Sequence, residues 1–358
     1  MKHMSITALL VLSATLLAAC QSKEHIILTS VQEDDIESSA QVVSKSTRSA
    51  ATALLAALTD EQKKKAVNDI KAPLRKDWHF IPRDRMGLML GDMSAEQKTL
   101  VHKLMQTALS DSGYLKATDI IWLETVLYEM SNKSPGRDPG KYVLQFFGDP
   151  ADETAAWGWR LEGHHLSINL TYTPEGVGVT PLFFGTNPAV VQQGPLAGKR
   201  LLADAHSLAL QLAKSMSDEQ KKKMMLDKKP RDVITGPGRE EMASKKQGVM
   251  TVNMTPKQWK ALNALVASHF QSFNSEHNEA LERQWGQRLP SIDNIELDAF
   301  AWAGPIDADE PFYYRIHGRR FVIEYSCQGK NHVHCVIHDL TDPLQEDLLK
   351  KHFEQHEH

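Results

Sequence analysis

Hydrophobic residues along this chain follow two periods that alternate in blocks. Val101, Leu104 and Met105 have the three- and four-residue spacing of a helix, and the same spacing returns over residues 262–266. Between the helical blocks, apolar and polar residues alternate with the two-residue period of a strand. The expected strands cover residues 142–147, 165–172, 179–184, 312–316, 321–327 and 332–337. The pattern predicts an α+β fold in which helices are followed by antiparallel β-hairpins, twice over.

Four helix starts carry the same short motif, a Ser or Thr with Gln three residues later. The expected N-cap residues are Thr59, Ser94, Ser217 and Thr255. In such a capping box the hydroxyl accepts from the backbone of the third helical residue, and the Gln side chain accepts from the N-cap backbone. Further helices are expected to end near residue 58, to cover 117–130 and 344–353, and to begin near 201.

One strand motif occurs twice. WRLEGHHLSIN at residues 159–169 matches YRIHGRRFVIE at 314–324, with an aromatic residue, Arg, an aliphatic residue and Gly in the same order. The copies differ at the basic pair, which is His164-His165 in the first and Arg319-Arg320 in the second. The difference suggests that one copy keeps a specialised site on a shared scaffold.

The strand motif and the capping boxes return at offsets of about 155 to 161 residues. Repetition at one offset predicts an internal duplication, with a first half at 50–205 and a second at 206–358. Residues 184–198 are rich in Gly and Pro, which predicts a loop. The charged stretch 229–248, which contains Gly236-Pro237-Gly238, predicts a long exposed excursion, either a mobile lid or a simple loop.

The N-terminus has the pattern of a bacterial lipoprotein signal peptide. Two basic residues precede an apolar run at 6–17 that is too short to span a bilayer. Leu-Ala-Ala-Cys then stands at 17–20 and resembles the box read by the lipoprotein peptidase. The resemblance implies removal of residues 1–19 and lipidation of Cys20, with 20–49 as anchor and tether.

Lipidation of Cys20 would make the membrane a partner of this protein. Gln21 follows the cysteine, whereas Asp commonly retains lipoproteins at the inner membrane. We therefore expect attachment to the outer membrane, facing the periplasm. The alternative is an ordinary secretory signal with an incidental cysteine.

Composition excludes one class of partner. The formal net charge is −4, and basic residues do not cluster around an aromatic platform, so no nucleic-acid partner is expected. The Lys63–Lys65 and Lys221–Lys223 runs follow acidic residues at helix starts, as on a solvated helix face. The length after the signal suits two domains or two joined halves.

Two cysteines remain after the signal, Cys327 and Cys335. In an oxidising periplasm a pair this close is expected to form a disulfide. The alternative is a thiolate metal ligand, because Cys335 directly follows His332-Val333-His334.

Longer motifs carry a family resemblance. They are WGWRLEGHHLS at 157–167, FFGTNPA at 183–189 and NHVH at 331–334, with shorter matches at RDP, FG, YYRI and DLL. Over roughly residues 50–356 the chain resembles the family catalogued as Domain of Unknown Function 3500, which implies no activity. Against that pattern, Cys335 stands where Ser is usual and His338 where Arg is usual, so the cysteine pair is particular to this chain.

The histidines offer the most specific chemistry. His332 and His334 point to the same face of a strand, a common way to present two imidazoles to one metal ion. His164 and His165 would face opposite ways, so only one of them can join. Three imidazoles, with Glu162 or Glu324, would suit a divalent Zn, Fe or Cu ion with an open position for water. A metal-bound water acidified towards neutrality could attack a substrate, with Glu162 as candidate base; redox chemistry fits the same ligands.

A structural interpretation stands beside this one. The paired histidines could hydrogen-bond the turn at Gly163, and the later pair could lie on a wet sheet face. Arg160 and Arg315 could bind a carboxylate or phosphate, or pair with local acids. Trp159, beside Trp157, could stack on a ligand, or lie in the core.

Two functions of different classes follow. The first is a periplasm-facing metal-dependent enzyme of hydrolase type, with a histidine-rich site between the halves. The second is a non-catalytic lipoprotein that binds a small-molecule ligand or a protein partner in the groove between the halves.

Overall fold

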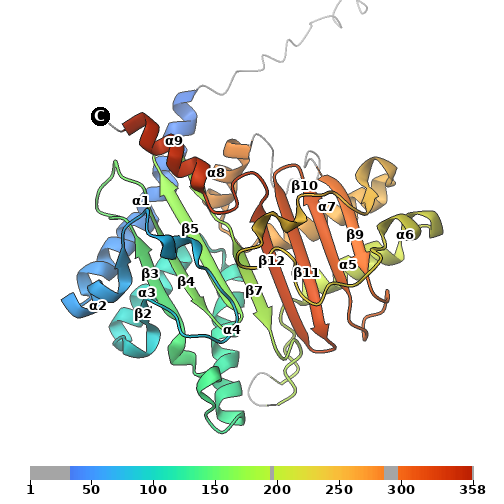
Figure 1. The fold of residues 1–358 in the computed structure, drawn as a ribbon, viewed down its shortest axis with the longest axis horizontal. Coiled ribbons are helices and arrows are strands. Elements are labelled where there is room, and N and C mark those ends of the chain that lie inside the picture. Colours follow the sequence, from blue (N-terminus) through green and yellow to red (C-terminus); the bar gives the residue numbers. More distant parts are fainter. Residues whose placement is uncertain (1–32, 194–196, 286–296, 357–358) are drawn as a thin grey trace, which may run out of the picture.

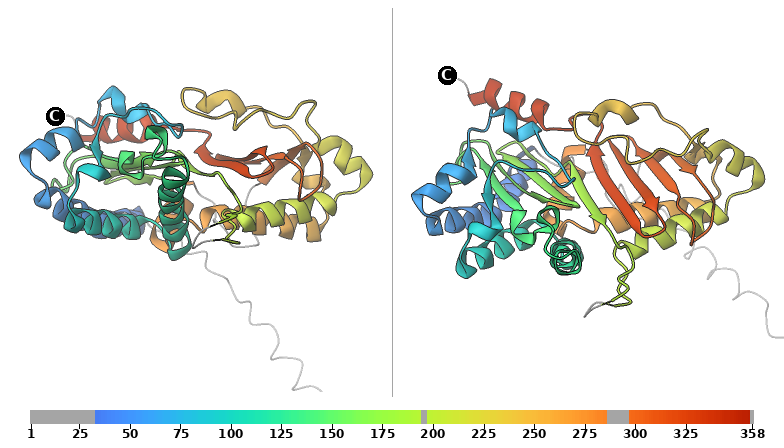
Figure 2. Two further views of the ribbon diagram at one scale, coloured as in Figure 1. Left: turned by 90° about the horizontal axis from the view of Figure 1, so that it is seen from below. Right: turned by 60° about the horizontal axis from the view of Figure 1, so that its bottom comes forward.

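The computed structural model describes residues 33–193, 197–285 and 297–356. Within these residues, helices cover one face of a 12-stranded sheet, and two long segments and the last helix lie against the other face (Figures 1 and 2). The strands are β1 (Val67–Asn68), β2 (Leu88–Met89), β3 (Val143–Phe147), β4 (Trp157–Gly163), β5 (Leu166–Thr173), β6 (Gly176–Gly178), β7 (Leu182–Thr186), β8 (Val249–Met250), β9 (Leu297–Ala303), β10 (Tyr313–Gly318), β11 (Phe321–Gly329) and β12 (His332–Asp339). The α-helices are α1 (Glu33–Ala57), α2 (Asp60–Ala66), α3 (Ala95–Ala108), α4 (Asp111–Met130), α5 (Ala203–Lys214), α6 (Asp218–Met224), α7 (Pro256–Phe270), α8 (Ser275–Trp285) and α9 (Glu346–His356).

One sheet runs through both parts of the chain. Its order is β1-β3-β4-β5-β7-β12-β11-β10-β9-β8, with β2 beside β3 and β6 beside β5. The pairs are antiparallel except β1 with β3. The first and second parts meet where β7 pairs with β12, with Gly185 opposite His334 and Phe183 opposite Val336. The mixed helix and sheet composition predicted by the hydrophobic pattern is confirmed.

The four expected capping boxes are present, and they are linked in pairs. Gln62 and Gln97 hydrogen-bond each other, and each also donates to a backbone carbonyl, of Asp92 and Ala57 respectively. The second part repeats this arrangement, in which the linked residues are Gln220 and Gln258 and the carbonyls belong to Asn253 and Ser215. The same side-chain network therefore fastens α2 to α3 and α6 to α7. Duplication as the origin of this recurrence stays a prediction.

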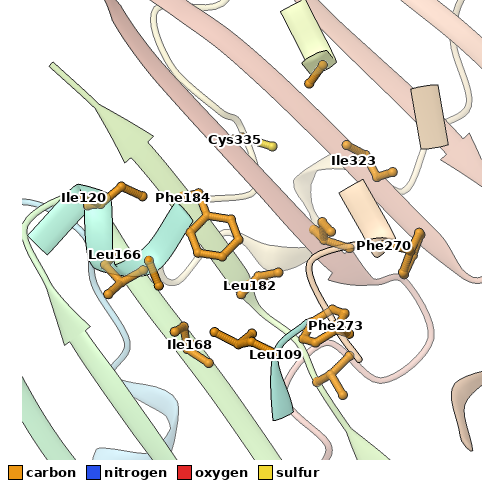
Figure 3. Packing of buried hydrophobic residues seen from close by; sticks show 14 of the residues in the cluster. Leu109, Ile120, Leu166, Ile168, Leu182, Phe184, Phe270, Phe273, Ile323 and Cys335 are labelled. Atoms are coloured by element: carbon orange, nitrogen blue, oxygen red, sulfur yellow. The ribbon is translucent and has the colours of Figure 1, made fainter. Parts of the chain in front are cut away.

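The main core lies between the sheet and the helices. Figure 3 shows part of it, where side chains of β5 and β7 meet those of α4 and β12. Ile120, Leu166, Leu182 and Phe184 are all buried there. Burial of such side chains, each worth roughly 1.5–3 kcal/mol, joins the two parts into one core.

The other face of the sheet is covered by residues 69–87 and 226–248. A small apolar cluster lies beneath them and holds Trp78, Phe80, Phe183, Val233 and Val336. The indole of Trp78 donates to Glu240 at 2.8 Å, so the two covering segments are tied together. The exposed excursion expected at 229–248 is therefore wrong in part, because Val233 and Ala243 are buried, whereas Met242 is exposed.

Local boundaries differ from expectation where a cap was missed. Helix α4 begins at Asp111, six residues before the predicted start, because the Ser110 side chain accepts from the Gly113 backbone. Strand β9 and helix α8 were not predicted from the hydrophobic pattern. Among the described residues, no helix is both long enough and apolar enough to span a membrane.

Candidate metal site at the junction of β7 and β12

Three imidazole rings converge where the two parts of the sheet meet. The Nε2 atom of His332 lies 3.0 Å from Nε2 of His165 and 3.0 Å from Nε2 of His334. One nitrogen from each ring lies within 4.8 Å of the others. Nitrogens at this spacing can all reach one ion at a typical Zn–N distance of about 2.0–2.1 Å. The structure thus brings together His332, His334 and one member of the earlier pair, as the sequence predicted.

The backbone explains why these three rings meet. His332 and His334 alternate with Val333 on β12 and therefore share the sheet face opposite the helices. His165 sits in the turn between β4 and β5 with φ 63°, a left-handed conformation that redirects its side chain. Its N–H donates to the carbonyl of Phe80, and its carbonyl accepts from Gly185. The turn is thus held at both ends beside β7.

Gly185 leaves the room that the rings occupy. A Cβ atom at this position would lie 2.9 Å from Cδ2 of His165 and 3.0 Å from Cδ2 of His334. Contacts this short would push both imidazoles away. The cluster therefore requires a glycine at position 185 of β7.

Asp232 orients the ring of His334. Its carboxylate lies 2.7 Å from Nδ1 of His334 and also accepts from the side-chain amide of Gln328 at 2.9 Å. A proton on Nδ1 donates to the carboxylate, which leaves the Nε2 lone pair directed at the other rings. Carboxylates commonly hold metal-binding histidines in this way.

Burial favours the neutral form of the His165 and His332 rings. Desolvation, followed by repulsion from neighbouring histidines, lowers the pKa of His165 well below its usual value and that of His332 to about 4. A wall of two stacked rings, Phe80 and Phe183 at 3.9 Å, meets the edge of His334. His332 alone is partly exposed, so the cluster is open on that side. Neutral imidazoles are the form that coordinates metals.

His164 leaves the cluster. Its Nδ1 lies 2.9 Å from a carboxylate oxygen of Glu124 on α4 and 3.0 Å from Arg137, while its ring stacks on His165 at 3.8 Å. Glu124, His164 and His165 form a second group with metal-ligand spacing. His164 is thus not a ligand of the three-ring cluster. Its ring stacks against His165, which is one of the three.

Comparison with known proteins assigns most of the chain, including the three-histidine cluster, to a family. Residues 40–342 match the family described as protein of unknown function (DUF3500). The chain belongs to this family. No curated protein and no solved structure matches it.

Glu162, expected as a base, is occupied elsewhere in this DUF3500 protein. It is buried, accepts from the His79 backbone at 2.8 Å and pairs with Arg85 at 3.4 Å. Burial raises its pKa, against the opposing effect of Arg160. In the second part, Glu324 likewise accepts from the backbones of Ile234 and Thr235, both at 2.8 Å. Both carboxylates therefore anchor the covering segments, and neither is a ligand of the cluster.

The three residues expected to bind a ligand also have internal partners. Arg160 is buried and donates to Asn169 at 2.5 Å and to the carbonyl of Leu74 at 3.0 Å. Arg315 donates to Gln247 at 2.5 Å, and Trp159 lies in the core. Their strands are buried on both faces, which the repeated motif could not reveal. The ligand-binding assignment is corrected to a scaffold role.

The expected Cys327–Cys335 disulfide is wrong, because both residues are buried free thiols. On the β11–β12 ladder, Cys327 faces Val333 and Cys335 faces Tyr325, so the two cysteines are not directly opposite. Cys335 points to the helix side, where its Sγ lies 3.3 Å from Nδ1 of His269. It is therefore on the opposite face from His334 and is not a ligand of the cluster.

Sequence reasoning missed one residue of the site, Asp232, and one separate group of possible metal ligands. Asp232 lies in an irregular segment, and no local spacing connects it with His334. A third group with metal-ligand spacing consists of Glu175, His352 and His356. The i, i+4 spacing of its two histidines on α9 is a signal that could have found it.

Proposed function

We propose that this protein binds a divalent metal ion, Zn, Fe or Cu, through His165, His332 and His334. The observation that carries the proposal is the convergence of three Nε2 atoms. When the Nδ1–H of His334 donates to Asp232, its Nε2 carries a lone pair and no proton. A proton on His332 Nε2 can be donated to only one of the two neighbouring rings, so the other 3.0 Å approach of two nitrogens is left without a hydrogen bond. A cation between the rings removes this conflict.

Three neutral nitrogen ligands leave a further coordination position for water or substrate. Such an ion would lower the pKa of a bound water and polarise a carbonyl or phosphoryl oxygen, which supports a metal-dependent hydrolase. The protein's contribution would be to hold the rings with Asp232 and Gly185 and to exclude water on the side of Phe80 and Phe183. Redox chemistry is compatible with the same ligands. Glu162 is not retained as the base.

Metal analysis of protein purified without a polyhistidine tag tests the proposal. We expect one equivalent of metal per chain, retained through gel filtration, or one equivalent taken up when Zn²⁺ or Co²⁺ is titrated into metal-free protein. The variant His332→Ala/His334→Ala should lose this equivalent. The matched control is His352→Ala/His356→Ala, which removes a histidine pair from the α9 group and should keep it. Less than one equivalent in the wild type after titration with Zn²⁺ or Co²⁺, or loss in the control variant alone, would refute the proposal.

We also propose that the chain is a lipoprotein attached through Cys20 and facing the periplasm from the outer membrane. The support is the Leu-Ala-Ala-Cys box and Gln21; both lie outside the described residues. Fractionation after labelling with a radioactive fatty acid tests this. Label and outer-membrane recovery should both disappear in Cys20→Ser, and a labelled Cys20→Ser variant would contradict the proposal.

We propose, finally, that residues 50–205 and 206–358 derive from a duplication. The linked capping glutamines support this, as does the recurrence of β2 to β5 in β8 to β11. Superposition of α2–β5 on α6–β11 tests it. A common trace with the strands in the same order and direction is expected, and a match that requires a permuted order would contradict it.

A further inference from the structure

A second candidate site lies on the helix side of the sheet, away from the histidine cluster. It is a cavity of about 460 Å³, here called the helix-face cavity. Its walls come from both parts of the chain and include Ile120, Leu182 and Phe184 on one side and His269, Tyr325 and Cys335 on the other. Figure 3 shows Ile120, Leu182, Phe184 and Cys335 among the buried side chains of this region. The volume lies within the roughly 300–1,000 Å³ typical of small-molecule sites.

Lys116 is the polar group that distinguishes this cavity. Its Nζ lies 3.3 Å from the carbonyl of Ser268 and 3.2 Å from the hydroxyl of Ser272. Among the described residues, no carboxylate forms an ion pair with it. Burial lowers the pKa of Lys116, as expected of a cation without full compensation. A half-buried ammonium held by two long contacts to neutral oxygens can accept an anionic partner.

The remaining charges favour the same sign of ligand. Lys199 at the cavity is already paired with Asp119 at 2.5 Å. Arg200 and Asp204 are both exposed, and Asp204 attracts the Lys116 ammonium without forming an ion pair with it. Lys116 therefore presents a positive charge that has no ion-pair partner among the described residues, in a mainly apolar cavity.

We propose that the helix-face cavity binds an amphipathic carboxylate, with the carboxylate on Lys116 and the apolar part against Leu182, Phe184 and Ile337. The charge-assisted hydrogen bond to Lys116 provides sign selectivity, because it replaces contacts to neutral oxygens. The apolar walls provide affinity. This site is independent of the metal proposal, since its residues lie on the other face of the sheet.

Titration calorimetry with three probes of equal chain length tests the proposal. Decanoate, decanol and decyltrimethylammonium are each added below the concentration at which they aggregate. We expect decanoate to bind the purified protein with one-to-one stoichiometry and more tightly than the other two. Absence of decanoate binding, or equal binding of the cationic probe, would overturn the proposal.

Two variants locate the site. Lys116→Met keeps the apolar stem and removes the charge, and it should weaken decanoate binding by about tenfold or more while decanol binding changes little. Ser272→Asp places a carboxylate beside the ammonium and should weaken decanoate binding as an internal competitor. The matched control is Lys98→Met, since Lys98 lines a different cavity. Unchanged decanoate affinity in Lys116→Met protein with a wild-type melting temperature would assign the binding elsewhere.

Discussion

Buried neutral histidines should make the stability of this protein fall in mild acid, and His277 allows the effect to be measured in isolation. His277 on α8 has no exposed surface. Its Nδ1 lies 2.8 Å from Oδ1 of Asn274, and its Nε2 lies 2.9 Å from the hydroxyl of Tyr172. The neutral ring donates to Asn274 and accepts from Tyr172. Burial lowers its pKa from 6.5 to about 3.

The sign and size of the effect follow from proton binding. Between pH 6.5 and 3 the unfolded chain binds a proton at this residue and the folded chain does not, so the free energy of unfolding falls as pH falls. Above pH 6.5 both states are neutral and the residue has no effect on the pH dependence. At about 1.4 kcal/mol per pH unit, lowering the pH to 5 spans 1.5 units and costs about 2 kcal/mol.

Urea unfolding at pH 7.5 and pH 5.0 measures this difference. The variant His277→Gln keeps a polar group for Tyr172 but cannot titrate, so its loss of stability between the two pH values should be about 2 kcal/mol smaller than that of the wild type. Tyr172→Phe is the control. It should lower the free energy of unfolding by about 1 kcal/mol at both pH values and keep the pH dependence, because burial is the cause of the shift. Equal pH dependence in wild type and His277→Gln would refute the reasoning.

Three further predictions concern the metal site and the thiols. Gly185→Ala should lower metal affinity at least about tenfold, because its Cβ would displace two ligand rings. The control Gly136→Ala has open space around the new Cβ and should keep wild-type affinity. Equal chelator-competition curves for the two variants would contradict the prediction. Asp232→Asn should weaken metal binding by roughly 10–100-fold in the same assay, and wild-type affinity would exclude its orienting role. Without reductant, a thiol reagent should react with both Cys327 and Cys335 in the denatured protein. If neither cysteine reacts, the two form a disulfide and the assignment as free thiols is wrong.

Much of the fold is encoded locally and could be predicted. A capping box depends on side chains within one turn, so Thr59, Ser94, Ser217 and Thr255 were found from sequence alone. Alternation along β12 likewise placed His332 and His334 on one face, because the side chains of a strand alternate whatever surrounds it. Element boundaries were less certain where a cap stood alone, as Ser110 does before α4.

The candidate site depends on neighbours that sequence spacing does not reveal. His165 joins the cluster, and His164 does not, because His165 has a left-handed backbone conformation and hydrogen-bonds Phe80. Asp232 contacts His334 from a segment 102 residues away. Glu162 looked available for catalysis until the fold placed Arg85 beside it. Sequence patterning thus determined which residues share a strand face or a helix turn, since those relations are set by backbone period. Only the tertiary structure decided which faces meet, because the pairing of β7 with β12 and the packing of the covering segments join residues far apart in the chain.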